Sequence, residues 1–434
     1  MKSKMTLQIN PQLRICLFLS FSIGLVPDAE GGEDMTIHRN EPKSWLNKVP
    51  EVTIFFWIIK VLCTTVGETF SDFLNINAGL GLTLTTVLMG VAFLVVLFLQ
   101  FKASKYVPIL YWLTVVLISV FGTLVTDNLT DALGVPLETS TIVFSGLLAL
   151  TLFLWYMSEK TLSIHSIFTI RREAFYWLTI LFTFALGTAV GDLFSEQLGL
   201  GYLKTGIAVL MVIAVVFAAW KGKLNEVLAF WIAYILTRPL GASLGDYLSQ
   251  SKVNGGLALG ATITSVIFLI AIVAIIVFLG VSKVDVIVNK ESSTPKSGNQ
   301  SAKSVFLQTS AALIVFLAVG IGGYEWCTKN IVPEVDASQT SLSGQLADFI
   351  AIENEMLQAV HTGDFATAKT DANQLEHDWD KAEPKLRKID RKTWTGIDGT
   401  IDDVLAATRA KQPNESKCEN VLQESLNSLN QANA

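Results

Sequence analysis

The chain has 434 residues, of which 51% are hydrophobic and 16% are charged, with a formal net charge of −6 and a mean hydropathy of +0.48. Soluble domains carry about a quarter charged residues. This composition therefore excludes a wholly soluble protein and predicts that most of the chain lies in a lipid bilayer. The acidic excess is concentrated in residues 331–434, and neither the charge nor its distribution indicates nucleic-acid binding.

The N-terminal segment, residues 1–50, has two interpretations. Residues 14–26 hold about a dozen apolar positions, too few for a span, and resemble the apolar region of a signal peptide. Alternatively, translation starts at Met35 and the residues before it do not belong to the protein. Both interpretations stay open, and the lead-in to the first span is expected to be cytoplasmic.

Eight apolar stretches follow in pairs, each long enough to cross a bilayer as a helix of about 20 residues. They cover residues 52–74 and 80–101, 108–130 and 137–157, 174–197 and 202–220, and 227–248 and 256–280. A membrane domain over residues 51–281 is therefore predicted. A flexible cytoplasmic linker, 282–304, is expected to separate it from a ninth span at 305–325.

Each pair begins with a tryptophan that is followed ten residues later by glycine and fifteen residues later by aspartate. The four sets are Trp57, Gly67 and Asp72; Trp112, Gly122 and Asp127; Trp177, Gly187 and Asp192; and Trp231, Gly241 and Asp246. This spacing predicts a fourfold internal repeat. Because each unit holds two spans, the four copies enter the membrane in the same direction, as parallel repeats about an axis along the membrane normal.

Basic side chains set the expected orientation. They gather before the first span and in the loops after the second, fourth, sixth and eighth, whereas the opposite loops hold Lys204 and Lys252. Short cytoplasmic loops carry the excess of Lys and Arg. We therefore expect a cytoplasmic N-terminus and an extracytoplasmic C-terminal domain, residues 326–434.

In three of the four pairs, the first span carries a stripe of polar or small residues. Positions 7, 11, 14 and 15 after the tryptophan share one helix face about 100° wide. Glu68, Thr123 and Thr188 stand at the eleventh position of the first three copies, and Arg238 stands at the seventh position of the fourth. We expect the stripe to face a shared interior, where Glu68 and Arg238 form a gating or structural charge pair at similar depth.

The signature residues have structural and functional interpretations. We interpret the tryptophans as aromatic anchors at the cytoplasmic interface and the glycines as close contacts between helices. The four aspartates lie toward the outer interface. There they either cap a following turn or act together with Glu68, Thr123 and Thr188 as cation-binding residues.

The tandem hairpins, for example FYWLTILFTFALGTAVGDLF and YWLTVVLISVFGTLVTDNL, resemble a family of bacterial inner-membrane proteins. That family consists of four copies of a two-span repeat of unknown function, each with a characteristic tryptophan, and its members are often labelled membrane-anchored. The resemblance covers about residues 50–282. It implies a multi-pass protein of the inner membrane, and movement of metal cations is the activity suspected for proteins of this kind.

Residues 341–431 predict a soluble bundle of three or four amphipathic helices, with breaks at Gly363, Pro384 and Pro413 and with Trp379 and Trp394 in its core. Within this tail, three potential metal ligands share one helix face. They are Glu376, His377 and Asp380. The face is interpreted either as a divalent metal site or as a solvated surface.

These patterns predict an all-α polytopic membrane protein with four parallel two-helix repeats, a ninth span and a soluble helical bundle. No nucleophile–base pair or phosphate loop indicates an enzyme, and no cofactor is expected. Carboxylates and hydroxyls suit hard divalent cations such as Mg²⁺ or Mn²⁺, so we expect a transporter of such a cation, with efflux favoured. The alternative is a membrane-anchored sensor or scaffold whose outer domain binds a ligand or partner. The sequence leaves a homo-oligomer open.

Overall fold

The computed structural model describes residues 47–252, 255–286, 302–335, 339–410 and 412–434. Within these ranges the regular elements are all helical, and nine helices are long and apolar enough to cross a membrane. The predicted all-α polytopic class and its nine spans are thus confirmed. The signal-like stretch at 14–26, Met35 and most of the linker at 282–304 lie outside the described residues.

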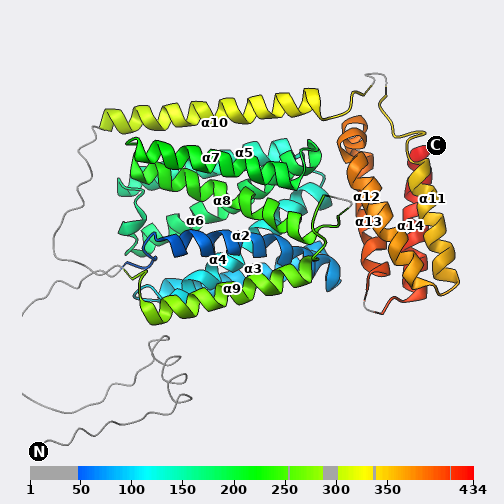
Figure 1. Cartoon of the computed structure of the whole chain (residues 1–434), viewed down its shortest axis with the longest axis horizontal. Helices are drawn as coiled ribbons and strands as arrows, with labels where there is room; N and C mark the ends of the chain where they lie inside the picture. Colours follow the sequence, from blue (N-terminus) through cyan, green and yellow to red (C-terminus); the bar gives the residue numbers. More distant parts are fainter. Residues whose placement is uncertain (1–46, 253–254, 287–301, 336–338, 411) are drawn as a thin grey trace, which may run out of the picture.

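Eight of these helices form a membrane domain of four hairpins (Figure 1). The first helices of the hairpins are α2 (Ile54–Asp72), α4 (Pro108–Asp127), α6 (Ile170–Asp192) and α8 (Glu226–Ser249). The second helices are α3 (Leu82–Lys102), α5 (Leu137–Glu159), α7 (Tyr202–Lys221) and α9 (Ala261–Ser282). Helix α9 begins later than predicted because the segment before it folds back on α8, where Leu257 N donates to Tyr247 O at 2.7 Å.

The first helices form a closed inner ring. Contacts run from α2 to α4, from α4 to α6, from α6 to α8 and from α8 back to α2. Buried residues make up 50–67% of the most apolar window of each inner helix but 11–28% of that of each outer helix. Every outer helix packs on the inner helix of the next hairpin, and α9 completes the cycle on α2. The hairpins are therefore interlocked around one central axis.

The repeat glycines lie at the contacts that close this ring. Each one faces the residue that stands seven positions after the tryptophan of the next copy. The pairs are Gly67 with Ser119, Gly122 with Phe184, Gly187 with Arg238 and Gly241 with Thr64. A side chain at Gly67 would overlap Ser119, and one at Gly241 would overlap Thr64. Small residues allow inner helices to approach this closely in lipid.

The tryptophans form a second closed set. Each one contacts the aromatic residue that precedes the tryptophan of a neighbouring copy. The pairs are Phe56–Trp112, Tyr111–Trp177, Tyr176–Trp231 and Phe230–Trp57, with ring centroids 5.5, 5.5, 6.3 and 5.7 Å apart. Trp112, Trp177 and Trp231 are at most 4% exposed. Their interpretation as anchors at the membrane interface is therefore wrong. The helix face that carries these tryptophans packs against the next repeat, and burial of the large aromatic rings stabilises that contact.

Three inner helices continue past the repeat aspartate into a single π-helical turn. These turns are η1 (Phe73–Asn77), η2 (Asn128–Ala132) and η4 (Leu193–Gln197). Asp72, Asp127 and Asp192 stand at the junctions, and their side chains make no capping hydrogen bond there. Asp246 lies within α8 and is buried. Capping therefore does not explain the repeated aspartate, and π turns are frequent at functional sites.

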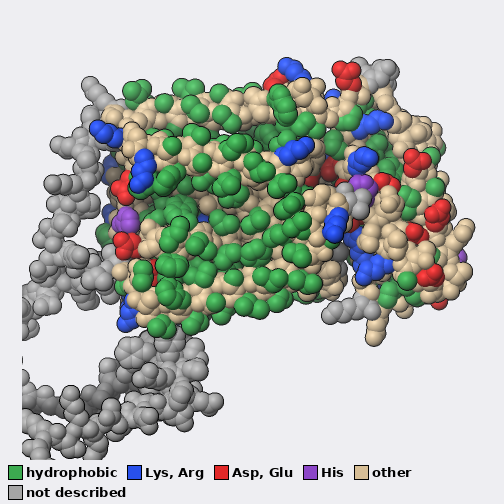
Figure 2. Space-filling view, viewed as in Figure 1, with side chains coloured by type: hydrophobic (Ala, Val, Ile, Leu, Met, Phe, Trp, Pro, Cys, Tyr) green, Lys and Arg blue, Asp and Glu red, His purple; other side chains and the backbone are tan. Residues whose placement is uncertain are grey.

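We call the end of the membrane domain with the π turns the Asp end and the opposite end the Trp end. The ninth apolar helix, α10 (Ala302–Asn330), runs along the outside of the domain and leads to a four-helix bundle at the Asp end (Figure 1). The bundle consists of α11 (Ala347–His361), α12 (Phe365–Ile389), α13 (Arg391–Thr408) and α14 (Glu415–Asn433). Figure 2 shows hydrophobic side chains over the flank of the membrane domain and charged ones over the bundle.

The bundle core agrees with the sequence, except at one proline. Trp379 and Trp394 are buried in it, with their rings stacked 5.8 Å apart. Pro384 was expected to end a helix, but α12 runs through it to Ile389. An interior proline removes one backbone hydrogen bond, and packing of the turns after it on the bundle core holds the helix. The break falls at Asp390, whose side chain caps α13.

Candidate functional site

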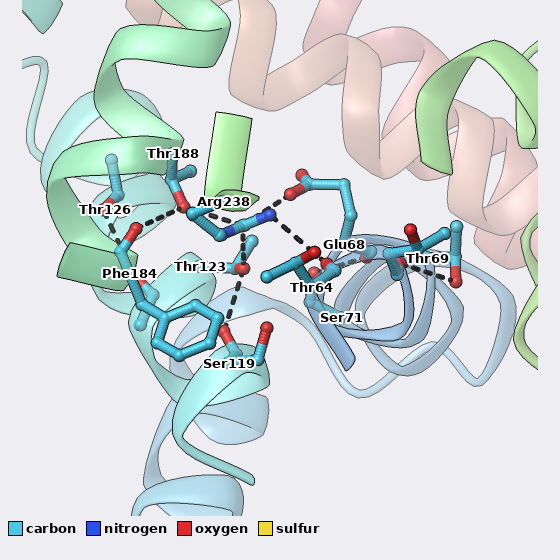
Figure 3. A network of polar contacts seen from close by, with 12 residues as sticks. Thr64, Glu68, Thr69, Ser71, Ser119, Thr123, Thr126, Phe184, Thr188 and Arg238 are labelled. Carbon is cyan, nitrogen blue, oxygen red and sulfur yellow. Dashed lines mark hydrogen bonds and ion pairs between the residues drawn. The ribbon is translucent and has the colours of Figure 1, made fainter. Parts of the chain in front are cut away.

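The centre of the inner ring holds a buried arginine. Arg238 extends from α8, next to Pro239, and has no exposed surface. Its Nη2 donates to Glu68 Oε2 at 2.6 Å and to Thr188 Oγ1 at 2.7 Å, and it also contacts Thr123 Oγ1. Its Nη1 donates to the Thr64 carbonyl at 3.4 Å, as Figure 3 shows. The predicted pair of Glu68 and Arg238 is thus present.

All four repeats contribute to this network. Glu68, Thr123 and Thr188 come from the same repeat position of α2, α4 and α6, and they converge on the arginine of α8. The stripe therefore faces the interior, as expected. An intramembrane arginine is costly unless it is paired, and here one carboxylate and three neutral oxygens hold it. Its Nε has no hydrogen-bond partner among the described residues.

A cavity of about 1650 Å³ lies between this network and the bundle. Glu68 lines it, so the cavity reaches the network, while fully buried Arg238 lies behind. Acidic side chains come from both sides. The membrane domain contributes Asp72, Asp127, Asp131, Asp192 and Glu196, and the bundle contributes Glu376, Asp380, Glu383, Asp398, Asp402 and Asp403. We call this cavity the acidic vestibule.

The bundle is held over the vestibule by contacts with the π turns and by one polar junction. Helices α12 and α13 contact η4, η2 and η1. At the junction, Glu138 of α5 accepts hydrogen bonds from Gln197, from Tyr324 at 3.4 Å and from Arg391 of the bundle at 3.2 Å. The bundle thus forms the outer wall of the vestibule.

Charge accumulates in the vestibule as the pH rises. Enclosure by protein, followed by the negative charges of Asp131 and Glu376, raises the pKa of Asp402 to about 7. Enclosure and the charge of Asp402 likewise raise the pKa of Asp398. Carboxyls that face one another across a cavity resist ionising together. A cation that enters the vestibule therefore relieves mutual repulsion between acidic groups.

The acidic side chains are spread around the ring rather than clustered. Among the described residues no three His, Cys, Asp or Glu side chains form a group that could hold a metal ion. This applies to Glu376, His377 and Asp380, for which a metal site was one interpretation. Glu376 instead pairs with Arg409, with Nη2 to Oε2 at 2.6 Å. The aspartates of the four repeats likewise form no such group among the described residues, and Asp246 does not line the vestibule.

Aromatic side chains fill the ring on the far side of the network. Tyr111, Tyr176 and Tyr234 have no exposed surface, and the hydroxyls of Tyr111 and Tyr176 are 2.5 Å apart. The four tryptophans surround them in the same cluster. The ring interior is thus open at the Asp end as far as Glu68 and filled by aromatic side chains at the Trp end.

The repeat organisation of this site has a counterpart in a known family. Residues 55–106, 110–161, 175–223 and 229–284 each match the family model described as Repeat of Unknown Function (DUF347). The chain belongs to this repeat family. Each match covers one inner helix and the outer helix that follows it, so the DUF347 repeat is one hairpin of the ring. Comparisons with curated proteins and with solved structures found no match.

Sequence reasoning missed three groups of the DUF347 domain. Asp131 and Glu196 line the vestibule four residues beyond the repeat aspartates, and this shared offset was a detectable signal. Lys60, three residues after Trp57, is 1% exposed in the ring interior. At about 100° per residue this offset falls close to the edge of the polar stripe, which was the sequence signal for this lysine.

Proposed function

We propose that the protein moves a small hard cation of the Mg²⁺ or Mn²⁺ class across the membrane. The observation that carries this proposal is the acidic vestibule, which leads from the bundle to Glu68 at the centre of the ring. Oxygen ligands suit hard cations, whereas soft metals require Cys, Met or His. In the described interior network the groups that accept hydrogen bonds from Arg238 are carboxyl, hydroxyl and carbonyl oxygens.

The separated carboxylates suit a hydrated cation. Mg²⁺ dehydrates reluctantly and keeps several waters. A wide acidic cavity therefore attracts the hydrated ion through the electric field of its carboxylates rather than by direct coordination. Such a cavity raises the local concentration of cations. In this proposal Asp72, Asp127 and Asp192 attract the ion, and Glu68 is the first carboxylate that it meets inside the ring.

Arg238 acts in this proposal as a tethered cation that occupies Glu68 when no ion is bound. A divalent ion at Glu68 competes with the guanidinium, which retains hydrogen bonds to Thr123 and Thr188. The arginine thereby keeps the carboxylate from attracting protons or wrong ions in the empty state. A fixed positive charge at a constriction also blocks uncoupled leakage of cations.

The proposed orientation in the membrane follows from the basic residues of the loops. We place the N-terminus and the Trp end in the cytoplasm and the Asp end with its bundle outside the bacterial inner membrane. Release of the ion from the vestibule to the exterior makes efflux the proposed direction. The vestibule would then be the outward-open part of the pathway, with the aromatic cluster as the closed inner gate.

Transport by the full chain in liposomes tests the proposal. The variant in which Asp72, Asp127, Asp192 and Asp246 are all replaced by Asn keeps shape and hydrogen bonding but removes the charges. We expect Mn²⁺ flux to fall at least tenfold, since the repeat aspartates no longer contribute their charges to the part of the vestibule next to the ring. The matched control is Asp348→Asn, which changes an exposed acid on the bundle. Wild-type liposomes without flux above empty ones would refute the proposed function, and normal flux of the fourfold variant would refute the role of the aspartates.

A second candidate function is a membrane-anchored sensor or scaffold, because the bundle supplies 17 of the 40 residues that line the vestibule. Expression of residues 35–290 without the bundle separates the two functions. A transporter should still alter the metal content of the host, measured by elemental analysis. A sensor should lose all effect.

A further inference from the structure

A lysine lies in the ring interior beyond the vestibule. Lys60 of α2 is 1% exposed, and its Nζ has no hydrogen-bond partner among the described residues. The ammonium lies between two aromatic rings, 3.8 Å from the centroid of Phe184 on α6 and 4.2 Å from that of Tyr234 on α8. Cation–π contacts offset part of the loss of hydration, but no carboxylate of the described segments forms an ion pair with this group.

Lys60 lies one helical turn behind the arginine network. It precedes Thr64, whose carbonyl accepts from Arg238, by four residues, and Tyr234 precedes Arg238 by the same interval. One turn of helix rises about 5.4 Å. Two positive side chains thus occupy adjacent layers of the ring, with Glu68 as the carboxylate of the arginine layer. This arrangement penalises a proton on Lys60, because a buried amine is charged at high cost next to a like charge.

The other titratable groups around this layer are of different kinds. Cys63 and Glu68 come from α2, Arg238 and Tyr234 from α8, Tyr176 from α6 and Tyr111 from α4. Helix α9, which also packs on α2, has no titratable side chain in its sequence. The thiol and the phenols are neutral near pH 7, and an arginine does not lose its proton. Lysine is the group in this layer whose protonation changes readily when it is buried.

We propose that Lys60 is a proton-binding site that couples cation transport to proton movement in the opposite direction. This inference rests on the proposed function and adds its coupling ion. When a divalent cation binds at Glu68 and displaces Arg238, the ring interior gains positive charge. The Lys60 N–H bond then breaks, its electron pair stays on the nitrogen, and the proton passes to water. When the cation leaves, the amine takes up a proton again, so that cation and proton alternate in the ring.

The geometry gives this proton a separate way out. The vestibule ends at Glu68, on the Asp side of the arginine, whereas Lys60 lies on the Trp side. Tyr234 contacts the ammonium, and the hydrogen-bonded hydroxyls of Tyr111 and Tyr176 follow one turn further toward the Trp end. Polar hydroxyls therefore continue beyond Lys60 into the aromatic cluster. The proton therefore has a polar route on the Trp side of the ring, separate from the vestibule through which the cation is released.

Proton release by the purified full chain tests this inference. Mn²⁺ is added to the protein in weakly buffered detergent solution, binding is followed by calorimetry, and released protons are counted with a pH indicator. We expect wild type to release about one proton more per Mn²⁺ than Lys60→Met does. The matched control Lys105→Met, at an exposed loop lysine, should release as many protons as wild type. Equal release by wild type and Lys60→Met would overturn the inference.

The outcomes separate the two proposals. Absence of Mn²⁺ binding by wild type would refute the proposed function, and the coupling would fall with it. Binding without the difference in proton release would refute the coupling alone. Met replaces an unpaired buried charge with an apolar chain of similar length, so we expect this variant to fold and to unfold at a higher temperature than wild type.

The wild-type chain provides a second measurement that needs no variant. The affinity for Mn²⁺, measured over the pH range in which the protein stays folded, should rise by up to tenfold per pH unit where Lys60 loses its proton. An affinity that does not change over this range would overturn the inference. Lys60→Arg, with a permanent charge, should bind Mn²⁺ at least tenfold more weakly than Lys60→Met at every pH.

Discussion

The charge pair at the ring centre gives the sharpest prediction, because its two members differ in access to water. Arg238 is fully buried, whereas the Glu68 side chain is 10% exposed and lines the vestibule. Glu68→Gln leaves a sealed guanidinium with neutral acceptors, which should cost about 3 to 5 kcal/mol of folding stability. Arg238→Gln leaves a carboxylate that can hydrate from the cavity or take up a proton, so its cost should be lower, about 1 to 3 kcal/mol.

Replacing both residues removes the unpaired charge that each single change creates. The double variant should therefore be at least about 2 kcal/mol more stable than the sum of the single losses predicts. The assay is equilibrium unfolding of the purified full chain in mixed micelles for wild type, both singles and the double. The matched control cycle uses the exposed pair Glu325 and Lys329 on α10, 58% and 73% exposed, where coupling should stay below about 1 kcal/mol.

Additive losses at Glu68 and Arg238 would refute the reasoning, since they would mean that the two side chains do not interact in the membrane. The reverse order of the single effects would show that water reaches the arginine rather than the glutamate. Recovery of stability by the double variant without recovery of flux would assign the pair to transport as well as to folding.

Three further predictions concern other parts of the chain. Gly67→Ala should destabilise the full chain by about 1 to 3 kcal/mol in thermal unfolding, because the new methyl overlaps the next inner helix. The control Gly146→Ala, with open space around it, should be neutral. Equal effects of the two changes would contradict the close-contact role of Gly67. Burial raises the pKa of Glu353 from its ordinary 4.5 to about 7, so the folded bundle binds the proton more tightly than the unfolded chain does. The folding stability of the bundle should therefore fall by about 3 kcal/mol as the pH rises from 4.5 to about 7, and then level off. Hydrogen exchange of α11–α14 in the full chain measures this dependence of stability on pH. Glu353→Gln should abolish the dependence. If the dependence persists in that variant, it arises from another group. A phosphatase fused at Ala434 should be active and one fused after Lys223 inactive, and the opposite pattern would invert the proposed orientation.

Periodicity made most of the membrane domain predictable. Apolar stretches of sufficient length identified the spans, and the repeated tryptophan, glycine and aspartate identified the parallel hairpins. The depth of Glu68 and Arg238 on one stripe was enough to predict their pairing. The coincidence of Glu68, Thr123 and Thr188 at one repeat position indicated a shared interior, and the ring brings these side chains onto the same guanidinium.

Other features depend on contacts that no single helix reveals. A tryptophan at a helix end looks the same in sequence whether it faces lipid or the next repeat. The aromatic residue before each tryptophan, such as Tyr111 or Phe230, was the signal that favoured packing between repeats. The acidic face of the bundle could not be assigned to the vestibule, because docking of a separate domain depends on residues far apart in the chain, such as Glu138 and Arg391.

The closed ring has a consequence for biosynthesis. Helix α2 brings Lys60 and Glu68 into the membrane first, and its window has a mean hydropathy of 1.4, the lowest of the nine described spans. Its ionic partner Arg238 follows 170 residues later, a delay of roughly 10 to 30 s at 5 to 20 residues per second. During this time Glu68 lacks its counter-charge, and the nascent first hairpin needs the translocon or a chaperone to remain inserted. Ribosomes stalled before α8 should therefore leave α2 extractable, whereas ribosomes stalled after α9 should leave it fixed in the bilayer.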